Sequence, residues 1–568
     1  MYGGGVKRIS SSAKRLFLCL ILICCAFAVF AQESLPFTKG IDMLTWFESY
    51  QESQVQSLNK YDENDFAMLK SMGVEIVRLP IHFANLMEPT YTGKVYDIVF
   101  EKLDQVCDWA EKYQIYLVID NHSFNSPEDQ KNPPSAKVHI EHLKAVWPQI
   151  AQRYKDRSEY IIYEILNEPN GRSDASAKWY KIQQEIIDVI RTYDTKHTIV
   201  VTSPSWSDIE TLIKMKPYKD PNLIYTFHSY QPEMFCGQGT TWLAGPDVKN
   251  VPFPYDKSRA SEIQYSDKNE WAKGEFQGKY QQEGNAEWVY QKIKKAADWG
   301  KKNKVRVWAG EMGAAWWINP SDRIAWINAA VAAYKGNKIP YCSWGIDGDT
   351  GFLKTGNGEF PNDIDKDALE AYGFKMPDEN LVAKKNAFYS DFPKKPYVVF
   401  DGFCGKGTRI QYIYLTKSVK DDDVHQYCEK TLDLKNAYLK FYLPKAIASK
   451  VAECHNDLVI SFAVKFTDAK QDFKLHFMDS DGGEELPPWR NTVQIKASDY
   501  KIGEWVTVEV PVSQFKEDGA WSDKIDKWFN PQGKFDWSRF DCVYFDFYHE
   551  KPNQKGDIYI DDVVIKQK

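Results

Sequence analysis

The chain has 568 residues, of which 43% are hydrophobic and 27% charged, and its formal net charge is −7 at pH 7. The hydrophobic fraction excludes a mostly disordered protein. The sequence has no apolar run of about 20 residues after position 32, which excludes a polytopic membrane protein. At roughly 100–200 residues per domain, this length predicts two or three domains, or one large barrel with a smaller module. Aromatic residues reach 15%, a content typical of proteins that stack rings on sugar faces, although most rings in any protein fill its core.

Residues 1–31 have the pattern of a secretory signal peptide. Four basic residues precede the apolar run Leu16 to Phe30, and Val29 and Ala31 place small residues at the −3 and −1 positions of a cleavage site. The run is short for a membrane anchor, which stays the weaker alternative. Removal of the four basic residues changes the net charge from −7 to −11. We therefore expect a secreted protein, extracellular or periplasmic, that contacts neither nucleic acid nor, after cleavage, a membrane.

The cysteines carry less information. Three of the ten leave with the signal peptide, and no spacing among the other seven indicates a zinc site. An exported protein permits disulfides, so the four in the C-terminal part could form two bonds of undetermined pairing. These four are Cys404, Cys428, Cys454 and Cys542.

Residues 32–380 alternate β-branched runs with amphipathic helical stretches. The predicted strands are a first one near Lys39–Leu44, then Val74–Leu79, Ile115–Asp120, Tyr160–Leu166, Thr198–Thr202, Leu223–Phe227, Lys304–Trp308 and Ile339–Trp344. Predicted helices include Glu63–Met72, Lys178–Thr192, Ala286–Asn303 and Ser321–Tyr334. Repeated strand–helix units imply a parallel sheet, and eight of them favour a (β/α)8 TIM barrel over an open sheet. The fold class is therefore α/β in this part.

The pattern changes beyond this region. Residues 381–397 have the character of a linker or a wrapping segment, and residues 398–568 alternate with a period of two, which predicts an all-β sandwich. Clear strands are predicted at 458–466, 473–477, 505–510, 543–547 and 557–565. Trp489, Trp521, Trp528 and Trp537 are candidates for a sugar-stacking surface, with a purely structural sandwich as the alternative. Adjacent Asp561 and Asp562 suggest a structural calcium site.

Two carboxylates stand at the ends of predicted barrel strands. Glu168 follows the fourth strand within Asn167-Glu168-Pro169, and Glu311 ends the seventh between two glycines. Active sites of (β/α)8 barrels lie at the carboxyl ends of the strands. Strands four and seven face each other across the barrel mouth, and two carboxylates in one pocket are what glycosidic bond cleavage needs.

With these motifs, residues 36–375 resemble glycoside hydrolase family 5. The resemblance implies that Glu168 is the acid/base and Glu311 the nucleophile, and it implies substrate-side roles for other residues at strand ends. These are Arg78 in Val77-Arg-Leu-Pro80, His122 in Ile119-Asp-Asn-His122, Asn167, the pair His228 and Tyr230, and the tryptophan platform Trp344. Two positions depart from the family pattern: Ser123 stands where many members have a second histidine, and Thr45 where many have Asn.

The resemblance also adds two tryptophans. The insertion from Gln231 to about Tyr280 contains Trp242, which we take as a candidate sugar platform, with a loop-pinning role as the alternative. Trp206 is a further candidate substrate contact, with a core or rim position as its alternative.

The hypothesis is a secreted, retaining endo-β-1,4-glucanase that acts as a monomer on β-glucan, requires no cofactor and has no metal in its active site. The alternatives are a β-mannanase or xyloglucanase of the same fold, or a non-catalytic glycan-binding protein. Arg78 and Tyr230 are expected to keep Glu311 ionised, whereas burial or the neighbouring negative charge must raise the pKa of Glu168 and keep it protonated.

Overall fold

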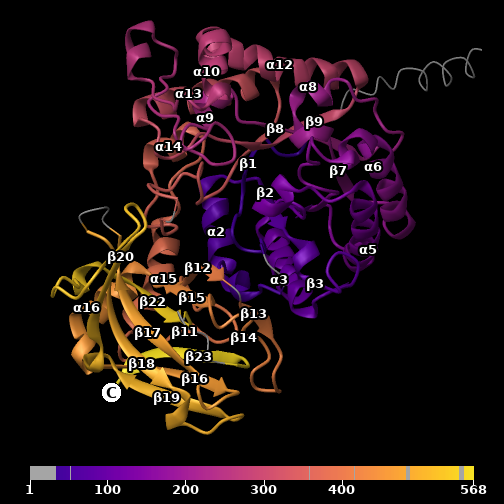
Figure 1. The fold of residues 1–568 in the computed structure, drawn as a ribbon. Helices are drawn as coiled ribbons and strands as arrows, with labels where there is room; N and C mark the ends of the chain where they lie inside the picture. Colours follow the sequence, from indigo (N-terminus) through magenta and orange to yellow (C-terminus); the bar gives the residue numbers. More distant parts are fainter. Residues whose placement is uncertain (1–33, 51–52, 357, 415, 482–485, 549–554) are drawn as a thin grey trace, which may run out of the picture.

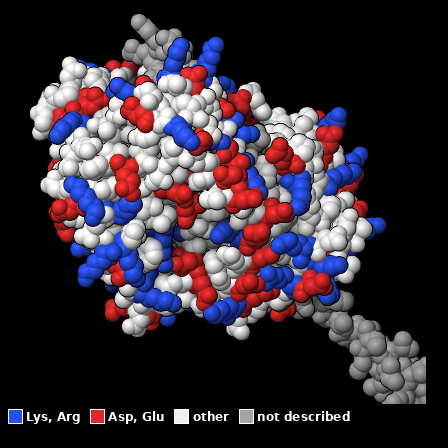
Figure 2. All heavy atoms as spheres, turned by 90° about the horizontal axis from the view of Figure 1, so that it is seen from below, with Lys and Arg blue, Asp and Glu red and all other residues white. Residues whose placement is uncertain are grey.

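The computed structural model describes residues 34–568 except 51–52, 357, 415, 482–485 and 549–554. Figure 1 shows two bodies: a barrel ringed by helices (indigo to magenta) and, below it, a β-rich domain (orange to yellow). The predicted signal peptide lies outside the described residues. Within them, no helix combines the length and apolar character needed to cross a bilayer. The face seen in Figure 2 carries acidic and basic side chains interspersed with one another.

The barrel confirms the predicted fold class. Eight parallel strands close in the order β1-β10-β9-β8-β7-β6-β5-β2. Their side chains are almost all buried, because the barrel interior and the surrounding helices cover both faces of a parallel sheet. The strands are β1 (Lys39–Asp42), β2 (Ile76–Ile81), β5 (Tyr116–Asn121), β6 (Ile161–Glu164), β7 (Thr198–Thr202), β8 (Leu223–Ser229), β9 (Arg306–Met312) and β10 (Tyr341–Ser343).

Helices form the outer layer, and the local sequence explains their ends. Asp62 caps the first of them in a capping box with Asp65, and Gly73 ends it in a left-handed conformation. Two predicted helices, Glu63–Met72 and Ala286–Asn303, are found with the same bounds. The outer helices are α2 (Glu63–Met72), α3 (Asp97–Tyr113), α5 (Ala136–Tyr154), α6 (Asp174–Tyr193), α8 (Ile209–Leu212), α12 (Ala286–Asn303), α13 (Pro320–Asn337) and α14 (Lys366–Ala371).

Short elements fill the loops between the strands and the outer helices. They are η1 (Gln56–Asn59), η2 (Phe83–Asn85), β3 (Met87–Glu88), β4 (Lys94–Val95), α4 (Pro127–Lys131), α7 (Pro204–Ser207), α9 (Glu233–Cys236), η3 (Lys257–Glu262), α10 (Glu270–Glu275), η4 (Phe276–Tyr280) and α11 (Gln281–Glu283). The last five of these lie in the long loop after β8.

The C-terminal domain is a β-sandwich, as predicted. Phe462 from one sheet meets Phe545 from the other at 5.4 Å between ring centroids, inside a core rich in phenylalanine. One sheet comprises β13 (Thr416–Val419), β14 (Cys428–Thr431), β23 (Ile558–Gln567), β16 (Leu458–Phe466) and β19 (Trp505–Pro511), with β11 (Tyr397–Phe400) also paired to β23. The other comprises β12 (Arg409–Tyr414), β15 (Tyr438–Tyr442), β22 (Phe540–Asp546), β17 (Asp472–Asp479), β18 (Trp489–Lys496), β20 (Lys516–Ser522) and β21 (Lys527–Phe529).

The segment predicted as a linker or wrapping segment is mostly helical. Helix α15 (Glu379–Ser390) occupies it and packs against both α2 and α16 (Lys445–Cys454) of the sandwich. The Lys385 ammonium reaches Asp65 of α2 in a buried ion pair. Since α15 is packed on both sides, the connection is an ordered part of the interface between the two domains.

Direct contacts also join the two domains. Gln56 of η1 donates to Ser418 at 3.0 Å and to the buried carboxylate of Glu429, and its carbonyl accepts from the Cys404 amide at 2.8 Å. Phe403, which follows β11, packs against the barrel's own core. The sandwich therefore covers apolar barrel surface and supplies partners for buried polar groups.

The expectation of two C-terminal disulfides is not met, because all seven described cysteines are free thiols. The four C-terminal ones lie in different surroundings and have no cysteine neighbour to bond. Cys404 is part of the sandwich core, Cys542 packs beside Met478 and Tyr544 outside that core, and Cys454 ends α16.

The four sandwich tryptophans do not form one stacking surface. Trp489 is 1% exposed, and Trp537 packs on the sandwich core with its ring stacked on His455. Only Trp521 and Trp528 face each other, as paired residues of β20 and β21, and Trp528 is 38% exposed.

Candidate active site

A bulge in the barrel wall brings two predicted site residues together. The register between β8 and β9 shifts after Phe227, so that His228 pairs with Glu311 and Gly310 is the extra residue. A Cβ atom on Gly310 would lie 2.7 Å from Thr226 Oγ1, which explains the glycine at this position. Bulges re-aim side chains beside active sites. Here the bulge directs Glu311 into the barrel mouth.

Arg78 is the centre of the charge network. It is fully buried on β2, and its guanidinium donates to Glu311 at 2.8 Å, to Asn167 at 2.7 Å and to both oxygens of Glu164 at 2.8 and 2.9 Å. Asp42 and Asp120 are also within 3.1 and 3.0 Å of it. One positive charge therefore serves four buried carboxylates.

The two predicted catalytic carboxylates lie next to each other across His228. One oxygen of Glu168 and one of Glu311 lie within 4.8 Å of each other, and both lie that close to a ring nitrogen of His228. His228 Nδ1 is 2.6 Å from Glu168 Oε1 and 3.4 Å from Glu311 Oε2. Burial lowers the pKa of His228 to about 4, so the imidazole between the two acids is neutral.

Burial governs the protonation of Glu168. It raises the pKa of this carboxyl to about 8, against the opposing effect of Arg78. A carboxyl with this pKa keeps its proton at neutral pH, as a general acid must. The expectation that burial protonates Glu168 agrees with this value.

The expected effect of Arg78 on Glu311 is only partly realised. Burial raises the pKa of Glu311 to about 7, and the charge of Glu168 adds to this rise. His228, Arg78 and the Tyr230 hydroxyl, which donates to Glu311 at 2.7 Å, oppose it without cancelling it. Glu311 is nevertheless the more acidic of the pair, which is the order that a nucleophile and an acid require.

The other predicted contacts lie near the ends of β5 and β10, two strands that β2 and β1 separate in the barrel. His122 is buried and bonded to Asp120 at 2.6 Å, and its ring stacks on Trp344 at 5.5 Å. Ser123, at one of the two departures from the family pattern, is buried, donates to Asn121 and accepts from the Ala84 amide. Thr45, at the other, contacts the Lys60 ammonium.

Trp242 and Trp206 are both partly exposed. Trp242 is 46% exposed, meets Tyr230 edge to face at 5.1 Å and donates to Asp349 at 2.9 Å. Trp206 is 37% exposed; its backbone amide donates to the carbonyl of Pro169, the residue after Glu168, and its ring donates to Gln130 at 3.0 Å. Trp206 also lies in a run of three residues with left-handed backbone, which is strained for a tryptophan. Trp242 is therefore linked to Glu311 through Tyr230, whereas only the backbone of Trp206 is placed near Glu168.

Sequence reasoning missed three members of the site: Asp42, Asp120 and Glu164. Each is fully buried in the barrel mouth, and burial raises the pKa of Asp120 and Glu164 to about 7. A signal was present, since each is an acid inside an otherwise apolar strand. An acid at such a position needs a buried cation, and Arg78 on β2 is that cation.

Two groups of side chains in the described part of the chain could offer three metal ligands: Glu168 with His228 and Glu311, and Glu48 with His82 and His122. Neither lies in the sandwich. There, Asp561 is bonded to His425 at 3.0 Å, and Asp562 is half-exposed beside it. The calcium site stays a prediction.

Comparison with known proteins agrees with the geometry. The family Cellulase (glycosyl hydrolase family 5) matches residues 40–350. Endoglucanase 3 of Fibrobacter succinogenes is 29% identical over 349 residues, which are 58% of this chain and 52% of that protein. Endoglucanase H of Acetivibrio thermocellus is 28% identical over 221 residues, 39% of this chain and 23% of that protein. The chain thus spans about half or less of the length of these two relatives.

A solved structure, endoglucanase Cel5A from Thermotoga maritima, is 27% identical and aligns with a TM-score of 0.47 over 59% of this chain and 96% of its own. The family match covers more than half of the chain. It includes all the barrel strands except Lys39, the first residue of β1. The chain belongs to glycosyl hydrolase family 5, whose members are retaining glycoside hydrolases that need no cofactor.

Proposed function

We propose that the protein is an exported endo-β-1,4-glucanase that cleaves internal bonds of β-glucan by double displacement. The observation that carries the proposal is the pair Glu168 and Glu311, with pKa values of about 8 and about 7 and oxygens within 4.8 Å. Retaining glycosidases place their two carboxyl groups about 5–5.5 Å apart, whereas inverting enzymes need about 6.5–9.5 Å. Endoglucanase is also the name of both relatives described above.

The first step forms a bond between enzyme and sugar. The Glu311 carboxylate attacks the anomeric carbon while the glycosidic C–O bond breaks, and Glu168 transfers its proton to the departing oxygen. Arg78 takes no part in the proton transfer. Its guanidinium donates to Glu311 at 2.8 Å and to the side-chain oxygen of Asn167, and so orients both groups. The Asn167 NH₂ group is then the part of this amide left to donate to the sugar 2-hydroxyl.

The second step reverses these roles. Glu168, now ionised, takes a proton from water, the water oxygen bonds to the anomeric carbon, and Glu311 leaves as a carboxylate. The product is a sugar with the β configuration, and both residues return to their starting protonation states.

Two alternatives concern substrate and catalysis. β-Mannan and xyloglucan are the rival substrates, because the acid pair is indifferent to the C2 and C6 substituents that distinguish these glycans. A non-catalytic glycan-binding protein is the rival of a different class. It has no use for a protonated acid held 2.6 Å from His228 beside an ionised one.

Hydrolysis assays with carboxymethylcellulose, glucomannan and xyloglucan separate these alternatives. The proposal predicts that carboxymethylcellulose is cleaved fastest and that NMR shows a β-anomer as the first product. Faster cleavage of either rival glycan would reassign the substrate, no cleavage of any would favour the binding protein, and an initial α-anomer would overturn the double displacement.

A further inference from the structure

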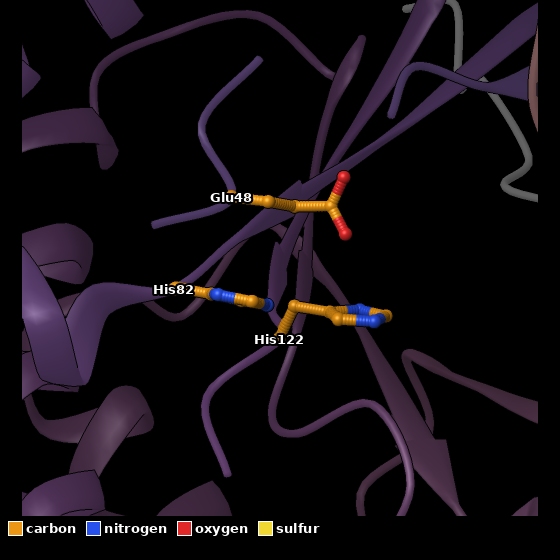
Figure 3. Close-up of side chains that lie close together, drawn as sticks. All are labelled: Glu48, His82 and His122. Carbon is orange, nitrogen blue, oxygen red and sulfur yellow. The ribbon is translucent and has the colours of Figure 1, made fainter. Parts of the chain in front are cut away.

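A second group of ligand-type side chains lies beside the catalytic acids. Glu48 follows β1, His82 follows β2 and His122 follows β5, and these three strands are neighbours in the barrel. Their side chains therefore reach the same sector of the mouth. Figure 3 shows the two imidazoles end to end, with the Glu48 carboxylate above them.

The spacing of these groups is close to that of a metal site. One ligand atom from each residue lies within 4.8 Å of the other two. Zinc binds nitrogen and carboxylate oxygen at about 2.0–2.2 Å, so two of its ligands can lie no more than about 4.4 Å apart. The 4.8 Å limit on the three groups is close to this span. Glu48 is partly buried, and its carboxylate accepts from the Thr45 amide and from the Tyr50 hydroxyl at 3.4 Å.

Hydrogen bonds fix which imidazole nitrogen is open. His82 Nδ1 lies 2.9 Å from the Ser49 carbonyl, which only accepts, so Nδ1 carries the proton and Nε2 has the lone pair. His122 Nδ1 lies 2.6 Å from Asp120 Oδ2, an oxygen that is also 3.0 Å from the Arg78 guanidinium. Metal-binding histidines are oriented in this way, with the second ring nitrogen bound to a carbonyl or a carboxylate.

His82 Nε2 is the observation that points to a ligand. His82 is 3% exposed, and among the described residues this nitrogen has no hydrogen-bond partner. A buried polar atom without a partner is unfavourable, and a ligand at His82 Nε2 would relieve this.

We propose that Glu48, His82 and His122 bind a divalent transition-metal ion of the zinc class, and that this ion and the glycan exclude each other. Two histidines and one glutamate, with positions left for water, are a known zinc ligand set. The Asn125 amide lies 3.0 Å from His122 Nε2 and must move aside when the ion binds. His122 stacks on Trp344, so the ion lies on the wall along which the sugar is expected to bind. The exclusion, unlike the metal binding, rests on the proposed function.

Titration calorimetry of the full chain with zinc chloride tests the site without any glycan. His82→Gln and Glu48→Gln should each weaken zinc binding by more than the 10–100-fold that loss of an outer-shell partner costs. His455→Gln, which removes a sandwich histidine, is the control and should leave the affinity unchanged. Cobalt(II) gives a second readout, a visible d–d band that both site variants should lose.

Asn125→Ala should change the zinc affinity in the opposite direction. It removes the amide that competes for His122 Nε2, so zinc should bind more tightly than to the parent chain. Unchanged zinc affinity in both His82→Gln and Glu48→Gln would place the ion at Glu168, His228 and Glu311 and overturn the proposal. An absence of zinc binding to the parent chain would overturn it as well, and His82 Nε2 would then be an acceptor for a sugar hydroxyl.

Inhibition kinetics test whether zinc and the glycan exclude each other. Zinc should raise the KM for carboxymethylcellulose and leave kcat unchanged, and His82→Gln should need more zinc for the same effect relative to its own zinc-free rate. Non-competitive inhibition would refute the exclusion. If no β-glucan is hydrolysed, the proposed function fails, whereas calorimetry still decides whether the metal site exists.

Discussion

The barrel mouth and the sandwich bury polar groups in different ways. In the mouth, Arg78 is shared among four buried carboxylates, and burial raises the pKa of the acids around it. In the sandwich, burial also raises the pKa of Glu429, but Thr416, Ser418 and Gln56 of the barrel all donate to it and oppose the rise. Neutral donors therefore surround this sandwich acid, whereas the acids of the mouth share one cation.

This difference separates catalysis from stability. Crowded carboxylates destabilise a folded protein, because burial and mutual repulsion both oppose their ionisation. The mouth retains them where a proton has to be moved. The sandwich also has acids whose pKa values burial raises, Asp479 to about 6 and Asp541 to about 7, but its contacts with the barrel have the properties of an ordinary core. Substitutions in the mouth should therefore change rates, and those at the domain interface should change stability.

Loss of the nucleophile should have the largest effect. Glu311→Ala should lower kcat on every substrate by on the order of 10⁴-fold or more, because the covalent step has no substitute nucleophile. Azide should partly restore turnover and yield an α-glycosyl azide, identifiable by NMR. Rescue without an α-azide product, or a loss below about 10-fold, would show that Glu311 is not the nucleophile.

Loss of the acid should depend on the leaving group. Glu168→Ala should lower the rate on polysaccharide by about 10²–10⁴-fold, the usual contribution of general acid catalysis, but should affect aryl glycosides with acidic leaving groups far less. Rates on carboxymethylcellulose and on a dinitrophenyl cellobioside measure the difference. An equal loss on both substrates contradicts the assignment.

Removal of the sandwich tests the interface. A chain that ends at residue 390 exposes the barrel surface packed by Phe403 and leaves Gln56 without its partners, so its melting temperature should fall. Gln56→Ala tests the polar contacts of the interface alone, because it removes one hydrogen-bond donor from Glu429. The free energy of unfolding should fall by about 1–3 kcal/mol, which lowers the melting temperature by several degrees. Gln291→Ala, at an exposed position of α12 in the barrel, is the control. An unchanged melting temperature in the truncated chain would show that the domains are independent.

The pH dependence of turnover should reflect the different protonation states of Glu168 and Glu311 in the mouth. Turnover needs Glu311 ionised and Glu168 protonated, so kcat/KM should rise with pH through about 7 and fall again through about 8. Tyr230→Phe removes a bond that favours the Glu311 carboxylate and should move the rising limb to higher pH. A plateau that extends down to pH 5 would contradict this pKa order.

The same two acids fix the sign of the stability change with pH. Their pKa values are raised in the folded protein, so they ionise more readily in the unfolded chain. Their contribution to stability is complete below about pH 4.5 and is lost as the pH rises toward 8. Urea denaturation at several pH values would show this loss, and Glu168→Gln should reduce it.

The strands and helices were predictable because apolar periodicity determines them, and Glu63–Met72 shows how far caps alone can fix the ends of a helix. Glu168 and Glu311 were predictable because both stand at strand ends within recognisable motifs. Asp42 and Glu164 were missed although each is an acid in a largely apolar strand, because their pairing depends on the Arg78 side chain reaching them across the barrel. The helix of residues 379–390 was missed because its sequence is weakly amphipathic: only Lys385 and Tyr389 are buried, and they contact different parts of the molecule.

The smallest effect should come from the exposed face of the sandwich. Trp528 is exposed, and the Arg490 guanidinium lies 5.5 Å from its ring and 5.3 Å from that of Tyr544. If this domain binds β-glucan, Trp528 is its best-placed ring, and Trp528→Ala should weaken binding by about 1–1.5 kcal/mol, roughly 5–10-fold. Trp537→Phe, a change to a packed ring, should not alter binding. Affinity electrophoresis in gels with β-glucan measures both, using Glu311→Ala chains so that the glycan stays intact. Retardation that is the same in all three chains would assign binding to the barrel alone, and the sandwich would then serve only to stabilise the enzyme.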